Sequence, residues 1–265
     1  MNRAVIPFFA SVVVLVICLA LLHSDPGLGP TDVSKPRLVV LCAAGLKGPV
    51  ERLAAAFEAD TGIRVTLELG GSQSLFAHLA DPHRRADVFL PADESYVRIA
   101  RANGLVGEGV PLARMHAVVI ALKPATPPDW ATLVSGRHRV AQADPAVAAI
   151  GKLTKDGLPP ANWQALDKAT TVYKPTVADV LNAVRLGAVD SGIVWDAIVV
   201  PHLDLAAAVP PELAGVTARV EAAVAARGAN PLAAERFVRY LADPARGGAA
   251  FRAAGYEVAG PGPAR

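Results

Sequence analysis

Cysteine is scarce in this chain, which has two cysteines among 265 residues. Cys18 lies in an apolar N-terminal segment, so Cys42 stands alone in the rest of the chain and no disulfide framework can form there. The six histidines show no spacing typical of metal ligands, and a single remaining cysteine cannot build a thiolate site. The sequence therefore predicts neither a resident metal ion nor another cofactor.

An excess of charge of one sign is also missing, because 26 lysines and arginines stand against 24 acidic residues. Aromatic residues make up only 5% of the chain, and no basic stripe interleaved with aromatics is present. Since nucleic-acid binding needs such a stripe, we expect no nucleic-acid partner. An apolar content of 52% over this length is enough for a large core, in one domain or in two lobes.

One long apolar run is present near the N-terminus, where Arg3 precedes the uncharged segment Val5–Leu22. A positive residue followed by such a run is typical of an export signal, and the length also suits an uncleaved membrane anchor. The next residues, up to Lys35, are rich in proline and glycine and are interpreted as a tether. We expect residues 1–35 to be an export signal or N-terminal anchor plus tether, and the protein to be periplasmic or extracytoplasmic, secreted or anchored through residues 5–22.

Strand and helix signals alternate after residue 36. Leu38–Cys42 is a continuous apolar run typical of a buried strand, and apolar residues then recur at helical spacing from Leu46 to Asp60. Further strands are expected at 64–69, 87–90, 116–122, 139–142, 170–173, 191–195 and 219–225, and helices at 75–80, 93–102, 150–158, 176–186, 231–241 and 244–254. This order predicts an α/β fold with mostly parallel sheets, in which ligands bind at the carboxyl ends of strands.

The turn Gly70–Ser74, between an expected strand and an expected helix, carries the clearest binding signal. Its two glycines and two hydroxyls place free backbone N–H groups, Ser72 and Ser74 around one small space, which suits an anion. The alternative interpretation is an ordinary glycine-rich turn in which Ser72 is the N-cap of the helix.

A serine hydrolase using Ser72 is the catalytic alternative. The turn misses the nucleophile elbow because Ser74 stands where that motif needs glycine. The histidines that could serve as its base, His138 and His202, have no further signature around them. We therefore expect no catalytic residue, and a protein that is not an enzyme.

Seven short motifs follow one another between Leu38 and Val258. They are Val40–Leu46, Gly71–Leu75, Ala86–Asp93, Ala143–Pro145, Val177–Val180, Gly192–Trp195 and Phe237–Leu241. In this order they resemble the molybdate-binding proteins that serve ABC transporters, within the type II periplasmic binding fold. The resemblance implies two lobes joined by hinge strands around a cleft. Lobe 1 is expected at 36–115 and 197–258, lobe 2 at 116–196, and a tail at 259–265.

The resemblance also implies a binding site. By position, the family's two oxyanion-contacting serines fall on Gly45, where the hydroxyl is missing, and on Ser72, where it is retained. Two backbone N–H donors at helix starts fall on Ile150 and Val180. The tyrosine of the second lobe falls on Trp195, which keeps one N–H donor. Replacement donors could come from Gln73, Ser74, Thr176, Lys47 or Lys152, although both lysines are more typical of solvated helix surfaces.

The function implied by the resemblance is capture of molybdate or tungstate by a monomer that delivers it to an ABC permease and its ATPase. The metal would be bound as an oxyanion, not as a coordinated cation. A tetrahedral dianion that loses its water in a closed cleft needs a donor for every oxygen, and helix N-termini can supply neutral ones. A binder of phosphate, sulfate or an organic anion in the same fold stays open, because Gly45 and Trp195 depart from the family's pattern.

Overall fold

The computed structural model describes residues 36–258, and the expectations for residues 1–35 and 259–265 lie outside this range. The strands are β1 (Arg37–Ala43), β2 (Arg64–Gly70), β3 (Val88–Leu90), β4 (Val110–Leu122), β5 (Val140–Ala143), β6 (Thr170–Lys174), β7 (Ser191–Trp195), β8 (Leu205–Ala208) and β9 (Thr217–Val224). The helices are α2 (Lys47–Thr61), α3 (Ser72–Ala80), α4 (Glu94–Ala102), α5 (Trp130–Leu133), α6 (Ala149–Gly157), α7 (Pro160–Ala169), α8 (Val177–Arg185), α9 (Asp196–Val199), α10 (Pro231–Ala242) and α11 (Gly247–Ala253), with 3-10 turns η1 (Ala44–Leu46) and η2 (Pro211–Leu213).

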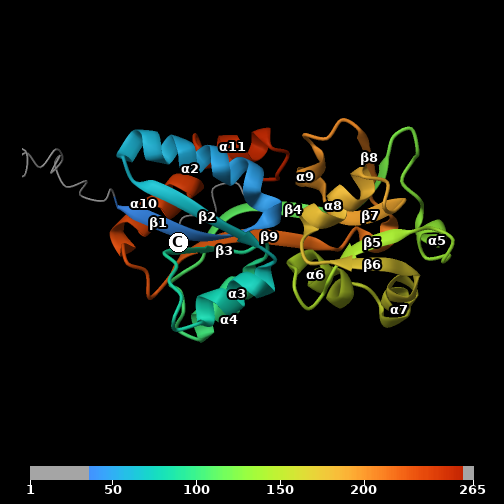
Figure 1. The fold of residues 1–265 in the computed structure, drawn as a ribbon, viewed down its shortest axis with the longest axis horizontal. Coiled ribbons are helices and arrows are strands. Elements are labelled where there is room, and N and C mark those ends of the chain that lie inside the picture. The colour runs from blue at the N-terminus through green and yellow to red at the C-terminus, as the bar shows by residue number, and fades with distance from the viewer. Residues whose placement is uncertain (1–35, 259–265) are drawn as a thin grey trace, which may run out of the picture. The chain divides into compact units, whose positions relative to one another are not determined.

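The strands are ordered β2-β1-β3-β9-β4-β7-β5-β6, with β8 beside β4 (Figure 1). We define the first lobe as strands β1, β2, β3 and β9 with their helices. The second lobe consists of strands β5 to β8 with their helices. This arrangement confirms the predicted α/β, two-lobe class. Parallel pairing joins β1 to β2 and β3, and β5 to β6 and β7. The expectation of mostly parallel sheets is wrong for β4 and β9, which pair antiparallel with all their neighbours.

Strand β4 links the two lobes. Its residues 110–116 pair with β9, and its residues 117–122 pair with β7 and β8. The sequence predicted a strand only from residue 116, because Pro111 interrupts the earlier part and coincides with a register shift. Since β8 pairs with the second part of β4, the pairing favours a later return to the first lobe than the predicted boundary at residue 197. The lobe boundaries stay a prediction.

Helices cover both faces of each lobe. In the first lobe α2, α10 and α11 pack together on one face, while α3 and α4 lie on the other (Figure 1). The Phe57 ring of α2 meets Phe237 and Tyr240 of α10 edge to face, with ring centroids 5.0 and 5.3 Å apart. In the second lobe α8 and α9 lie on one side of the strands and α6 and α7 on the other (Figure 1). Helix α2, early in the chain, and helix α10, late in the chain, therefore pack together in the first lobe.

Besides the four-residue helices α5 and α9, which were not expected, two longer helices differ from the sequence-based expectations. The sequence patterns missed α7, which begins at Pro160 because proline is well accepted in the first turn of a helix. Helix α11 was expected to begin at Pro244 and begins at Gly247 instead. The Asp243 carboxylate accepts the N–H groups of Ala245 and Arg246, both at 2.9 Å, and holds these residues in a turn.

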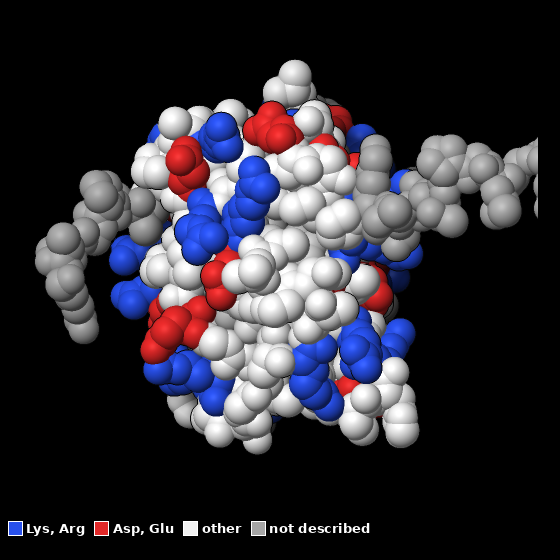
Figure 2. Space-filling view, turned by 90° about the vertical axis from the view of Figure 1, so that its left-hand side faces the viewer, with Lys and Arg blue, Asp and Glu red and all other residues white. Residues whose placement is uncertain are grey.

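The surface carries both signs of charge. Figure 2 shows one face on which basic and acidic side chains alternate with uncharged ones. Among residues 36–258, no helix has the length and apolar character needed to cross a membrane.

Candidate functional site

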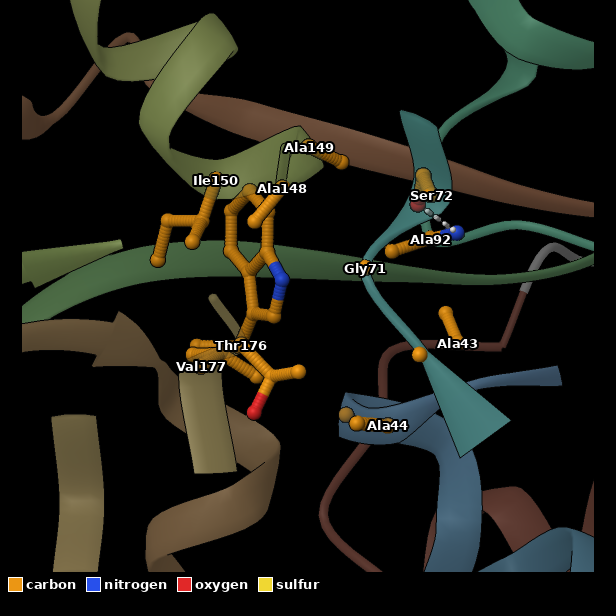
Figure 3. A pocket seen from close by; sticks show the side chains of 13 residues that line it. Ala43, Ala44, Gly71, Ser72, Ala92, Ala148, Ala149, Ile150, Thr176 and Val177 are labelled. Atoms are coloured by element: carbon orange, nitrogen blue, oxygen red, sulfur yellow. Dashed lines mark hydrogen bonds between the residues drawn. The ribbon is translucent and has the colours of Figure 1, made fainter. Parts of the chain in front are cut away.

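A small cavity lies where the two lobes meet. First-lobe residues that line it follow β1, β2 and β3, and second-lobe residues come from the starts of α6 and α8 and the end of β7. The lining residues are Ala43, Ala44, Gly45, Gly70, Gly71, Ser72, Ala92, Ala148, Ala149, Ile150, Thr176, Val177 and Trp195 (Figure 3). Its volume of about 20 Å³ is room for only a few atoms. No charged side chain is among these residues, so the site offers only neutral groups.

Three of the longer helices begin at this cavity. Their N-cap residues, Gly71 of α3, Ala148 of α6 and Thr176 of α8, all line it. The first N–H groups of a helix have no partner within the helix and carry the positive end of its dipole. Ile150 is the second residue of α6, and its N–H makes no hydrogen bond with another described residue. The cavity is therefore surrounded by uncharged donors that favour an anion.

Ser72 is the hydroxyl of the site. It is buried, and its Oγ accepts a hydrogen bond from the N–H of Ala92 at 3.1 Å (Figure 3). Since Oγ acts as acceptor in this bond, its own proton remains available to donate into the cavity. The alternative in which Ser72 is the N-cap is wrong, because Gly71 occupies that position and Ser72 is the first residue of α3. The sequence patterns did not single out Ala92, which lines the cavity and holds Ser72 through this bond.

Gly45 and Trp195 face each other across the lobes. Trp195 ends β7, is 1% exposed and makes no hydrogen bond through its indole N–H to another described residue. A buried indole N–H normally has a hydrogen-bond partner. Since no described residue accepts from this one, it is available to donate to a ligand. Gly45 is held from its own lobe by Tyr256, whose hydroxyl donates to the Gly45 carbonyl. Burial raises the pKa of Tyr256, so this donor stays protonated.

Val180 requires a correction. The alignment by motif placed a helix-start donor on it, but Val180 is the fourth residue of α8 and its N–H bonds to the Thr176 carbonyl at 3.2 Å. It does not line the cavity. Val177, the first residue of α8, lines the cavity in its place. The error arose because the motif predicted the helix without fixing its first residue, and N–H groups beyond the first turn are used inside the helix.

The replacement donors lie elsewhere or are already engaged. Ser74 is exposed and lies outside the cavity lining. Thr176 lines the cavity, but its hydroxyl caps α8 through the N–H and carboxylate of Asp179, at 3.1 and 2.6 Å. Lys47 and Lys152 lie on helix surfaces, where they pair with Glu51 at 3.7 Å and with Asp156 at 2.8 Å.

The two lobes are in direct contact beside Ser72. The N–H of Gln73 donates to the carbonyl of Val147 at 3.0 Å, which joins α3 of the first lobe to the loop before α6 of the second. A Cβ at Gly71 would lie 2.6 Å from the same carbonyl oxygen and 2.9 Å from that of Pro175. Gly71 is therefore required for this approach of the lobes, a role that its motif did not reveal.

Fold and cavity together define a two-lobe protein that can enclose a small solute between its lobes. Residues 38–257 match the family described as "Bacterial extracellular solute-binding protein", and the chain belongs to this family. The molybdate-binding protein ModA of Mycobacterium tuberculosis is 29% identical over 238 residues, which cover 84% of this chain and 85% of that protein.

Solved structures show the same fold. The periplasmic molybdate-binding protein of Azotobacter vinelandii superposes with a TM-score of 0.72 at 24% identity, over 84% of this chain and all of that one. The sulfate-binding protein SubI of Mycobacterium tuberculosis gives 0.70 at 18% identity, over 85% of this chain and 88% of that one. A periplasmic thiamin-binding protein gives 0.71 at 23% identity, over 85% and 84%. Because these proteins have different ligands, the shared fold leaves the ligand open.

Proposed function

We propose that this protein captures molybdate or tungstate outside the cytoplasm and delivers it to an ABC permease with its ATPase, without catalysis. The observation that carries the proposal is the cavity itself, where three helix N-termini, the Ser72 hydroxyl and the Trp195 N–H meet without a charged side chain. A dianion enclosed there would exchange water for neutral donors from both lobes. Its binding would thus link the lobes.

The residues that line the cavity also argue against an organic anion, phosphate and a hydrolase function. A volume of about 20 Å³ favours a small inorganic anion over an organic one. Phosphate near neutral pH keeps a proton that needs an acceptor, and no carboxylate lines the cavity. A hydrolase would need a base beside Ser72, and no histidine is among the lining residues. Sulfate remains the competitor to test directly.

The proposal predicts which anions stabilise the protein. Molybdate or tungstate at ~100 times its dissociation constant should add about 2.7 kcal/mol to the free energy of unfolding. Thermal unfolding of the protein with molybdate, tungstate, sulfate and phosphate in parallel measures this directly. Sodium chloride at matched ionic strength is the control. A larger shift with sulfate than with either heavy oxyanion, or no shift at all, would reject the assignment.

Replacing Ser72 by alanine is expected to weaken molybdate binding by roughly 1–3 kcal/mol, because one donor to the bound oxyanion is lost. Isothermal titration calorimetry measures the change. Ser74→Ala is the matched control, since Ser74 is exposed two residues further along the same helix. Equal affinities of the two variants would remove Ser72 from the site.

A further inference from the structure

The surroundings of residue 45, and not its backbone conformation, favour glycine at this position. Gly45 does not have a positive φ, so other residues could adopt its conformation. A Cβ at this position would instead lie 3.1 Å from Cγ1 of Val177 and 3.3 Å from Cδ1 of Trp195. Both neighbours belong to the second lobe. The place of a residue-45 side chain is thus already filled from across the cleft.

The side chain that fills this place is also a free donor of the cavity. Trp195 is fully enclosed, lines the same cavity as Gly45 and has an indole N–H that bonds to no other residue in the described range 36–258. A smaller ring at residue 195 would leave room above residue 45. A larger residue at 45 would push the indole, and the lobe that carries it, away from Ser72.

We propose that Gly45 and Trp195 form a size-matched pair that determines how closely the two lobes meet over the ligand. Glycine at 45 lets the indole reach the cavity, where the indole N–H serves as donor. The donor part of this proposal rests on the function proposed above. The steric part rests only on the distances around Gly45.

The contacts of Gly45 differ in kind from those of Gly71. A Cβ at Gly71 would meet main-chain oxygens of Val147 and Pro175, which no substitution can remove. The three atoms nearest to a Cβ at Gly45 all belong to side chains, the third being Cγ2 of Ile198 at 3.8 Å. A second substitution can therefore relieve a side chain at 45. The pair predicts non-additive effects of changes at 45 and 195.

A double-mutant cycle of Gly45→Ser and Trp195→Tyr tests the pair. Gly45→Ser alone is expected to weaken molybdate binding about tenfold or more through overpacking. Trp195→Tyr alone should weaken binding about tenfold, because the ring contact and the indole donor are lost. The double variant should bind at least about tenfold more tightly than the product of the two losses predicts, because the serine then occupies the space that the smaller ring leaves.

Thermal unfolding without ligand gives a second readout of the same cycle. Gly45→Ser should lower the melting temperature, and adding Trp195→Tyr should recover part of that loss, because the contact with Cγ1 of Val177 at 3.1 Å stays. Gly48→Ser is the control at residue 48, where, among the described residues and apart from the backbone of its own helix, a Cβ would have only Nη1 of Arg52 within 4 Å, at 4.0 Å. It should be additive with Trp195→Tyr in both measurements.

Additive effects of Gly45→Ser and Trp195→Tyr on both affinity and melting temperature would overturn the pair. If the unaltered protein binds none of the four oxyanions, the proposed function fails, and the ligand-free unfolding cycle still decides the size match. If Gly45→Ser does not fold, Gly45→Ala, which adds only the Cβ, takes its place in the cycle.

Discussion

Replacing Gly71 by alanine is expected to weaken molybdate binding about a hundredfold, or about 2.8 kcal/mol. The backbone of Gly71 is extended, with φ −72° and ψ 149°, so alanine fits it without strain. The added Cβ would lie 2.6 Å from the Val147 carbonyl oxygen and 2.9 Å from that of Pro175. These are main-chain atoms that cannot rotate aside. The lobes must separate, which removes the second-lobe donors from the ligand.

Isothermal titration calorimetry gives the affinity of the Gly71→Ala variant, and small-angle X-ray scattering with and without molybdate reports lobe separation. Gly48→Ala is a suitable control, because the nearest described atom to a Cβ there, outside the backbone of its own helix, is Nη1 of Arg52 at 4.0 Å. The variant should keep a larger radius of gyration in saturating molybdate than the control. Wild-type affinity in Gly71→Ala would show that the lobes need not approach this closely for binding.

Replacing Asp87 by alanine is expected to lower the free energy of unfolding by about 3 kcal/mol. Asp87 is buried in the first lobe, and its carboxylate accepts the N–H groups of Val39 at 2.8 Å and Asn230 at 3.1 Å. The substitution leaves both donors without a partner. It also removes the hydrogen bond that joins the start of α10, at Asn230, to the central strands. The melting temperature should fall by about 6–12 °C.

Asp81→Ala is the matched control for Asp87→Ala. Within residues 36–258, the Asp81 carboxylate accepts only the N–H of His83 at 2.8 Å, in an exposed turn. Its loss should change the melting temperature by little. Asp87→Asn, which keeps one acceptor oxygen, should fall between the two. Equal melting temperatures for Asp81→Ala and Asp87→Ala would contradict the role of Asp87 as a buried hydrogen-bond acceptor that joins two segments.

The sequence alone determined the order and type of most elements. Apolar runs and helical spacing predicted the strand at Leu38–Cys42 and the helix from Leu46 to Asp60, which the structure has as β1 and α2. These signals are local, because the side-chain period of a helix or strand is fixed by its own backbone. The same holds for the Gly70–Ser74 turn, where two glycines and a serine lead into α3. Alternation of the elements then sufficed for the α/β class.

The family resemblance implied that Ser72 and Trp195 belong to one site, and the tertiary structure decided which residues line the cavity. Ser72 and Trp195 are far apart in the chain, and the lobes bring them to one space of about 20 Å³. The structure also excluded Val180 from the lining and included Val177, since one turn of helix separates a free N–H from a bonded one. Likewise, the glycines at 45 and 71 are explained by second-lobe atoms that approach them. Contacts between lobes depend on packing across the whole chain, and no local pattern of residues encodes them.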